Sequence, residues 1–374
     1  MNTDALLPWL RLLRTPGIGP ATFHRLLSAS GAAAALGDAA WLRAAGLEAS
    51  LLRAWREVSE AELQRDLAWL SGAQRHVLTL DDPRYPAQLR EIPAPPPLLF
   101  VQGDPELLAL PQIALVGART ATPQGLENAE AFAAELTRRG FVVTSGLALG
   151  IDGAAHRGAL AADGYTVAVC ATGLDRVYPA RHKALAQEIA TRGALVSEFP
   201  TGVQALAEHF PRRNRLISGL SMGVLVVEAA QQSGSLITAR LALEQGREVL
   251  AIPGSIHNPM ARGCHALIRQ GAKLVETVDD ILVELGPLLG AHPARRAAAS
   301  ASASAGAAPT PTPEADERLA GILRAMGDET LTLDELVSRS TYPVAAVQAA
   351  LMMLELDGRI APAPGGRYQR LRRR

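Results

Sequence analysis

Cysteine is scarce in this chain of 374 residues. Its two cysteines, Cys170 and Cys264, belong to no Cys-x-x-Cys pair and to no cluster of cysteines and histidines. This excludes a disulfide framework and a structural zinc site, and it indicates a reducing compartment. No apolar run approaches the roughly 18 residues that cross a bilayer, and the amino terminus lacks a basic stretch followed by an apolar one. We therefore expect a cytoplasmic protein without a membrane partner.

An excess of charge is absent as well, since 37 basic residues balance 37 acidic ones. Any surface that binds a polyanion must therefore be a local basic patch. Lysine occurs only at Lys183 and Lys273, so the positive charge comes almost entirely from arginine. Because this bias runs along the whole chain, we interpret it as genomic base composition rather than a demand of one site.

The motifs of common nucleotide enzymes are missing too. No Gly-x-Gly-x-x-Gly follows an expected strand and no Gly-Lys-Ser/Thr occurs, which argues against the usual dinucleotide fold and against a P-loop NTPase. No acidic or histidine cluster has metal spacing, and Ser145 and Ser233 lie in no nucleophile elbow. His156 is more typical of a packed histidine than of a general base. We expect no catalytic residue, metal or cofactor.

What is present is a regular alternation of strands and helices between residues 112 and 285. Near-continuous apolar strands in such a pattern predict an α/β domain with a parallel sheet buried on both faces, an extended Rossmann-like doubly wound fold. Ligands of that fold bind outside the carboxyl ends of the strands. The expected strands are residues 113–116, 141–144, 166–169, 195–199, 224–227 and 249–252.

A glycine loop follows the second of these strands. Residues 145–156 read as a loop that enters a helix, with Gly146, Gly150 and Gly153 free to adopt unusual backbone angles. Backbone N–H groups can then face a ligand, and the helix N-terminus behind them favours anions, above all phosphate.

Other expected strand ends carry glycines, small hydroxyls and arginines, which suit a run of phosphates. Phe210 adds an aromatic platform beside basic residues, a combination expected for single-stranded nucleic acid. The alternative is that Phe210 fills the core and that its neighbours begin a solvated helix. The candidate binding residues are Gly117, Arg119, Gly146, Gly150, Phe210, Arg212, Arg213, Asn214, Arg215, Ser233, Gly234 and Ser235.

The remaining chain divides into three further regions. Residues 1–72 predict a helical domain of SAM or helix-hairpin-helix type, with a Gly17-Ile18-Gly19 turn that either contacts a DNA phosphate or merely joins two packed helices. Residues 73–286 complete the Rossmann-like domain. Residues 287–313 are rich in alanine, serine and proline and predict a linker. Residues 314–374 predict a winged helix.

The winged helix lacks the usual basic recognition helix. Its candidate, residues 344–356, contains neither arginine nor lysine, and after it positive charge appears at Arg359 and then from Arg367 onward. Major-groove readers present polar or basic side chains there. The pattern favours contact with a protein or a regulatory role.

Six motifs in order resemble the DNA-processing protein A (DprA/Smf) family: residues 117–119, 145–156, 173–179, 210–221, 233–239 and 252–255. The resemblance covers essentially the whole chain. It implies a non-enzymatic homodimer that binds single-stranded DNA during natural transformation and helps to load the recombinase RecA. The DNA-pocket arginine of the family falls on Arg119, and its aromatic and phosphate-binding elements fall on residues 210–215. Ala118 stands where the family often has serine or threonine.

Two other functions remain open from the residues. Rossmann-like nucleoside-monophosphate phosphoribohydrolases hold their substrate in similar glycine loops, and Glu228 could supply the carboxylate that such an enzyme needs near the sugar. A transcription factor that reads duplex DNA with its winged helix is the third possibility.

Overall fold

The computed structural model describes residues 3–30, 36–291, 321–327 and 331–340, together with residues 342, 347, 350, 351, 354, 359–363 and 367–370. The chain forms two compact units, Met1–Ala297 and Ala298–Arg374. The first residues of the predicted linker, 287–291, belong instead to helix α13 (Val278–Ala291), and from residue 292 onward the linker lies outside the described residues.

The first unit begins with a helical region, as the sequence predicts. Its core centres on aromatic side chains: the rings of Trp9 and Phe23 lie 5.4 Å apart, and Trp9 is fully buried. The helices are α1 (Thr3–Arg14), α2 (Pro20–Ser30), α3 (Ala39–Ala44), α4 (Ala49–Arg56) and α5 (Glu60–Leu70).

A nine-stranded sheet follows, in the order β1-β2-β6-β5-β4-β3-β7-β8-β9. Neighbours from β6 to β9 run parallel, whereas β2 is antiparallel to both β1 and β6. The α/β prediction is confirmed, and the sheet is mostly rather than wholly parallel. The strands are β1 (Arg75–Thr79), β2 (Leu98–Gly103), β3 (Gln112–Val116), β4 (Val142–Ser145), β5 (Thr166–Val169), β6 (Ala194–Ser197), β7 (Gly223–Val226), β8 (Glu248–Ala251) and β9 (Lys273–Leu274).

Side chains alternate between the two faces of the sheet. Ile113 and Leu115 of β3 belong to one buried cluster, and Ala114 and Val116 belong to the other. This period of two explains why the strands read as unbroken apolar runs.

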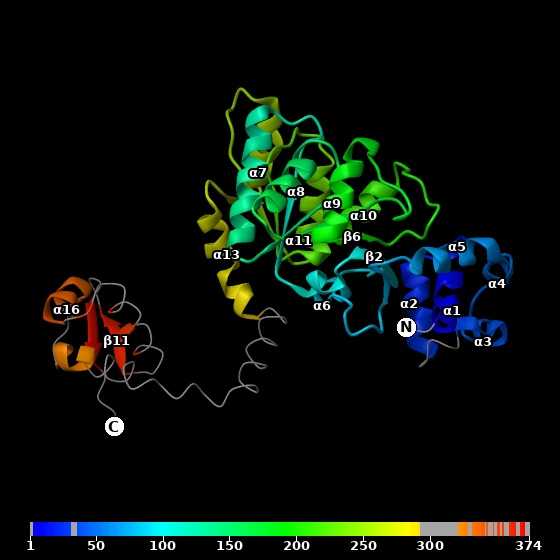
Figure 1. Cartoon of the computed structure of the whole chain (residues 1–374), viewed down its shortest axis with the longest axis horizontal. Coiled ribbons are helices and arrows are strands. Elements are labelled where there is room, and N and C mark those ends of the chain that lie inside the picture. Colours follow the sequence, from blue (N-terminus) through cyan, green and yellow to red (C-terminus); the bar gives the residue numbers. More distant parts are fainter. Residues whose placement is uncertain are drawn as a thin grey trace. The chain divides into compact units, whose positions relative to one another are not determined.

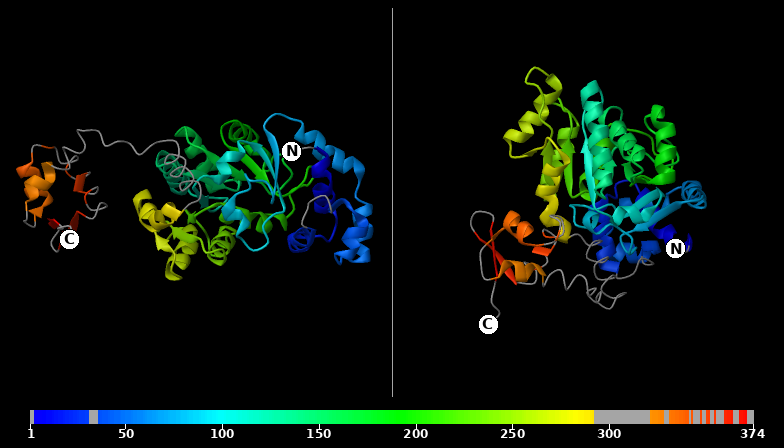
Figure 2. Two further views of the ribbon diagram at one scale, coloured as in Figure 1. Left: turned by 90° about the horizontal axis from the view of Figure 1, so that it is seen from below. Right: turned by 60° about the vertical axis from the view of Figure 1, so that its left-hand side comes forward.

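Helices cover both faces (Figures 1 and 2). They are α6 (Ala87–Arg90), α7 (Pro123–Arg138), α8 (Ile151–Ala161), α9 (Lys183–Arg192), α10 (His209–Leu220), α11 (Ser235–Glu244), α12 (Arg262–Arg269) and α13 (Val278–Ala291). Short 3₁₀ turns occur at η2 (Pro105–Ala109), η3 (Ala180–His182) and η4 (Pro259–Ala261).

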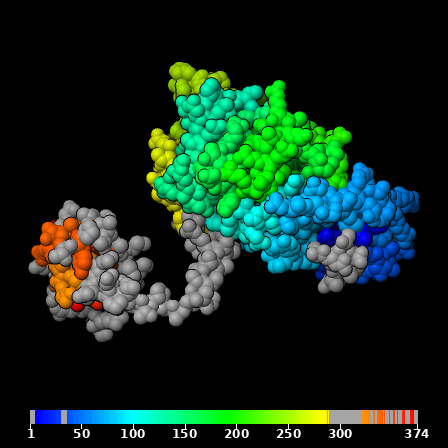
Figure 3. Space-filling view, viewed as in Figure 1, coloured from blue at the N-terminus to red at the C-terminus, as the bar shows by residue number. Residues whose placement is uncertain are grey.

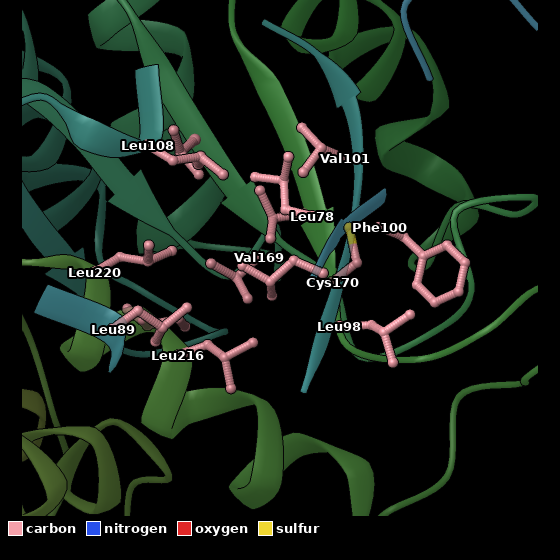
Figure 4. Close-up of a cluster of buried hydrophobic side chains, with 14 of the residues drawn as sticks. Leu78, Leu89, Leu98, Phe100, Val101, Leu108, Val169, Cys170, Leu216 and Leu220 are labelled. Atoms are coloured by element: carbon pink, nitrogen blue, oxygen red, sulfur yellow. The ribbon is translucent and has the colours of Figure 1, made fainter. Parts of the chain in front are cut away.

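The helical region and the sheet share one hydrophobic core. The ring of Trp69 on α5 meets Phe100 of β2 edge to face, with centroids 5.9 Å apart. Leu216 and Leu220 of α10 join the same cluster beside Leu89 of α6 (Figure 4). In the space-filling view the blue helical region directly adjoins the cyan and green sheet region (Figure 3).

The sheet reverses its direction of growth between β3 and β7. Strands β3 to β6 follow one another toward one edge, whereas β7 to β9 extend toward the other. At such a reversal the connecting loops separate and leave a crevice at the carboxyl ends of the two central strands. The loops after β3 and β7 therefore define where a ligand can enter.

The second unit has a small three-stranded antiparallel sheet, β10 (Leu331–Thr332), β12 (Arg367–Arg370) and β11 (Ile360–Ala363) in spatial order, and helix α16 (Leu333–Arg339). A capping box between Thr332 and Glu335 begins α16. Within residues 344–356 the structure describes four helical positions, all buried: Val347, Ala350, Leu351 and Leu354.

Candidate nucleic-acid interface

A cavity of about 620 Å³ opens at the carboxyl ends of β3 and β7. Eight of the predicted binding residues line it, although they come from three separate segments of the sequence. They are Gly117, Arg119, Phe210, Arg213, Asn214, Ser233, Gly234 and Ser235. The fold thus brings together most of the predicted set.

Phe210 lies at the centre of the basic part of this cavity. The guanidinium carbons of Arg119 and Arg213 lie 5.1 Å and 5.9 Å from its ring centroid. Arg119 is exposed and makes no hydrogen bond or ion pair with any described residue, although the carboxyl group of Asp152 in the same cavity interacts with it electrostatically. The arrangement offers a cation and a ring face to the same ligand.

Arg213 has a different environment, because its side chain is buried. It donates hydrogen bonds to the carbonyls of Gly146 and Val169 and, at 3.2 Å, to the Asn214 side chain. Burial lowers the pKa of Arg213, and the nearby carboxylate of Asp152 counteracts this effect. Arg213 therefore ties α10 to the ends of β4 and β5 and supports the ring of Phe210.

The glycine loop does not present the free donors that we expected. The N–H groups of Gly146 and Ala148 donate to the carboxylate of Asp152, at 3.1 Å and 3.3 Å. The side chain of Asp152, in the first turn of α8, therefore occupies the position of the anion, which corrects our hypothesis for these two amides. Burial raises the pKa of Asp152, while Arg213 acts in the opposite direction.

Gly117 and Gly150 serve close packing. A Cβ on Gly150, whose φ is +77°, would collide with the carbonyl oxygens of Ala118 and Arg119. A Cβ on Gly117 would meet the carbonyl of Glu228 at 2.8 Å. These glycines let α8 and β7 approach the end of β3, and they thereby fix the backbone that carries Arg119.

Arg212 and Arg215 do not line the cavity. Both donate to one oxygen of Glu198, Arg212 through Nη2 at 3.0 Å and Arg215 through Nη2 at 2.6 Å, and that carboxylate is buried. Arg212 lies over the ring of Phe199 instead of that of Phe210. The exposed side chain of Arg212 remains accessible to a ligand, whereas Arg215 is largely enclosed.

The hydroxyls at the start of α11 bind each other. The side-chain oxygens of Ser233 and Ser235 lie 2.7 Å apart, and the N–H of Ser235 donates to Ser233. Gly234 is exposed, and no atom lies within 4 Å of where its Cβ would be. A ligand backbone could come close at this point of the cavity wall.

A smaller hollow of about 80 Å³ adjoins the cavity at Arg119 and Phe210. Tyr178 lies beside Phe210, with ring centroids 5.7 Å apart, and Leu149 also lines the hollow. Tyr178 and Leu149 are 50% and 36% exposed, unusual for large apolar groups. We did not predict either as a binding residue, although Tyr178 belongs to a motif that supported the family resemblance.

The carboxylate required by a phosphoribohydrolase is already engaged. Glu228 accepts hydrogen bonds from the N–H and hydroxyl of Thr122, at 2.9 Å and 2.6 Å, and so caps the start of α7. His156 is fully buried, with Nδ1 2.7 Å from the hydroxyl of Thr166, as expected for a packed histidine. Burial is the main cause that lowers the pKa of His156 to about 3.

The basic residues around the Gly17 turn are engaged within the protein. Arg14 pairs with Asp66, Arg11 pairs with Glu60, and Arg25 donates to the carbonyl of Ala45. His24 lies 2.8 Å from the carbonyl of Pro95. This favours the interpretation of the turn as a connection between packed helices.

The described residues hold neither a metal site nor a membrane-spanning helix. No three His, Cys, Asp or Glu side chains gather there so as to hold a metal ion. No described helix is both long and apolar enough to cross a membrane.

Three family models match the chain: DNA recombination-mediator protein A over residues 76–286, the DprA-like N-terminal HHH domain over 3–64 and the DprA winged helix domain over 306–366. Protein Smf of Escherichia coli is 42% identical over 90% of this chain and 88% of its own length. DNA processing protein DprA of Streptococcus pneumoniae is 42% identical over 67% of this chain and 86% of its own.

Solved structures of DNA processing proteins also match the chain. DNA processing protein A of Streptococcus pneumoniae matches with a TM-score of 0.67 and 37% identity, covering 74% of this chain and 97% of its own. The Helicobacter pylori protein, studied for its single-stranded DNA binding mode, matches with a TM-score of 0.52 and 30% identity over 58% of this chain and 97% of its own. This chain belongs to the DNA-processing protein A (DprA/Smf) family of recombination mediators.

Proposed function

We propose that this chain binds single-stranded DNA in the cavity at the ends of β3 and β7. The observation that carries the proposal is the position of Arg119, an exposed cation that pairs with no described carboxylate and lies 5.1 Å from the ring of Phe210. Arg119 binds a backbone phosphate, and Phe210 stacks on a base of the same strand.

The small hollow between Tyr178, Leu149 and Phe210 takes a base rather than a phosphate. Its described lining is aromatic and apolar except at Arg119 and Arg213, and every nucleobase has a π-face that such rings accept. A base in a duplex is stacked and paired and cannot enter without being turned out, at a cost of a few kcal/mol. The site therefore prefers single strands, with little dependence on base sequence.

The same reasoning extends to the biological role. We propose that the bound strand is DNA taken up in natural transformation, that the chain acts as a homodimer without catalysis, and that it helps RecA to assemble on that strand. Membership of a family of recombination mediators supports this role. The winged helix, whose four described positions in residues 344–356 are buried, serves protein contact or regulation.

The site is tested by Arg119→Ala measured against Arg240→Ala. Arg240 is also an exposed arginine with no described partner, but it does not line the cavity. Affinity for a labelled oligothymidylate should fall at least tenfold in Arg119→Ala, since a charge-assisted contact contributes about 1.5 to 3 kcal/mol. Arg240→Ala should bind as the wild type does. Equal affinities of the two variants would refute the site.

RecA loading is tested with the same two proteins. On single-stranded DNA covered by a single-strand binding protein, RecA filaments should form faster with wild type and Arg240→Ala than with Arg119→Ala. If the wild type did not accelerate filament formation, the mediator role would be contradicted. DNA binding would still be tested separately by the affinity measurement above.

A further inference from the structure

A buried ion pair in the helical region reaches the segment that leads to Phe210. Asp66 on α5 is fully buried, and Arg14, the last residue of α1, is 7% exposed. Arg14 donates Nε to one carboxylate oxygen of Asp66 at 2.6 Å and Nη2 to the other at 2.8 Å.

Thr201, which lies between β6 and α10, completes this cluster. Its N–H and hydroxyl donate to Asp66 at 3.0 Å and 2.7 Å, and its carbonyl accepts from Arg14 at 2.8 Å. All three hydrogen-bonding groups of Thr201 are therefore held by two residues of the helical region. We call these three residues the Arg14–Asp66–Thr201 cluster.

Thr201 begins residues 201–208, the later part of the connection from β6 to α10. Most of the positions from 204 to 208 are exposed. Apart from the cluster, the segment is held near its start, where the N–H of Gly202 donates to Asp175 at 2.9 Å and the carbonyl of Val203 accepts from the N–H of Gly173 at 3.1 Å. The segment leads into His209, the first residue of α10, whose ring stacks on that of Phe199 with centroids 4.3 Å apart. Phe210 follows directly. A segment this open takes its course mainly from the points at which it is anchored.

From this geometry we infer that the Arg14–Asp66–Thr201 cluster positions Phe210, so that the helical region acts on DNA binding without touching DNA. The inference rests on the proposed function, because Phe210 matters only if the cavity binds DNA. A buried ion pair whose charges are fully hydrogen-bonded can favour one arrangement of the chain over others. Here it fixes where the segment before α10 begins.

The sharpest variant is Thr201→Val, which has nearly the same shape and leaves the ion pair in place. It removes the hydroxyl, which donates to Asp66 at 2.7 Å and accepts a longer hydrogen bond from Arg14 at 3.5 Å. Affinity for oligothymidylate should fall about two- to thirtyfold, the range of positional couplings within a domain. The four tryptophans of the chain, Trp9, Trp41, Trp55 and Trp69, all lie in the helical region. Their emission should be unchanged, which separates loss of position from loss of folding.

A matched control breaks a neighbouring ion pair. Glu60→Gln removes the 2.9 Å pair between Arg11 and Glu60, which joins the same two helices but does not reach Thr201. It should leave both DNA affinity and tryptophan emission as in the wild type. A loss of affinity equal to that of Thr201→Val would overturn the inference, because any weakening of the helical region would then suffice.

Hydrogen exchange supplies a readout that needs no DNA. Amides of residues 202–210 should exchange faster in Thr201→Val and in Asp66→Asn, but not in Glu60→Gln. Unchanged exchange and unchanged affinity in Thr201→Val overturn the inference, even if Asp66→Asn fails to fold. Arg119→Ala is measured beside them: if it binds like the wild type, the proposed function fails, whereas if it alone loses affinity, only the positioning role fails.

Discussion

At the scale of single residues, the sequence predicted which charged and aromatic residues lie at the site better than it predicted the partners of these residues. Arg119, Phe210 and Arg213 meet as expected, because each follows or precedes a recognisable strand. The pairing of Arg212 and Arg215 with Glu198 depends on the packing of α10 against the end of β6, which no local pattern encodes. The capture of two loop amides by Asp152 likewise depends on backbone angles rather than on residue type.

Tyr178 provides a test of base stacking. Tyr178→Leu should weaken oligothymidylate binding by about 1 to 3 kcal/mol, the contribution of one stacked base. Tyr165→Leu is the matched control, since Tyr165 is 53% exposed but precedes β5, at the opposite end of the sheet from the cavity. Binding measured by fluorescence anisotropy should change only in the first variant. Equal effects would indicate general loss of surface aromatics instead of a base site.

His156 predicts a pH dependence of stability. The pKa of about 3 in the folded state lies below the ordinary value of 6.5, so the unfolded state binds the proton more readily. Stability is therefore lost as the pH falls from about 6.5 toward 3. Between pH 7 and pH 5, this group lowers the free energy of unfolding by about 2 kcal/mol.

Urea unfolding of the wild type and His156→Gln at both pH values measures this effect. The variant should lose about 2 kcal/mol less than the wild type between pH 7 and pH 5, whatever its stability at pH 7. The same pH dependence in both proteins would show that His156 is not the group responsible.

At the scale of elements, alternation and glycine spacing predicted the sheet, its helices and the loops at its carboxyl edge. The antiparallel attachment of β1 and β2 was not predicted, because strand order depends on contacts distant in sequence. Residues 210–215 lie in the first turns of α10, so the alternative that these residues begin a helix holds for their secondary structure. Phe210 therefore lies in the first turn of α10, and the position of this turn depends on the segment before it.

Gly150 shows how one element positions another. Gly150→Ala places a methyl group against the carbonyls of Ala118 and Arg119 at a φ of +77°. Besides the strain of a side chain at positive φ, this overpacking should lower the free energy of unfolding by about 1 to 3 kcal/mol. Gly140→Ala is the control, since Gly140 has a φ of +86° with open space around it and carries about the backbone cost alone, 1 to 2 kcal/mol.

Thermal unfolding and DNA binding of both glycine variants separate the two effects. Gly150→Ala should lose stability beyond the loss in Gly140→Ala, and it should also lose DNA affinity because the backbone of Arg119 shifts. An affinity in Gly150→Ala equal to that in Gly140→Ala would contradict the role of this close approach.

At the scale of the whole molecule, the charged and aromatic groups of the proposed site all belong to the first compact unit. A chain that ends at residue 297 should therefore bind oligothymidylate as tightly as the full chain. Loss of affinity with unchanged tryptophan emission would instead assign a DNA contact to the second unit, as in the duplex-reading alternative.

The account depends most directly on single-stranded DNA being held through phosphate contacts at Arg119. Its test is the affinity for a single-stranded oligonucleotide and for a duplex of the same sequence, measured over a series of salt concentrations in wild type and Arg119→Ala. We predict tighter binding of the single strand, a steep loss of affinity with salt, and a slope that is shallower by about 0.7 in the variant because one counterion-releasing contact is gone. Equal binding of both DNAs, or the same slope and affinity in both proteins, would contradict the account.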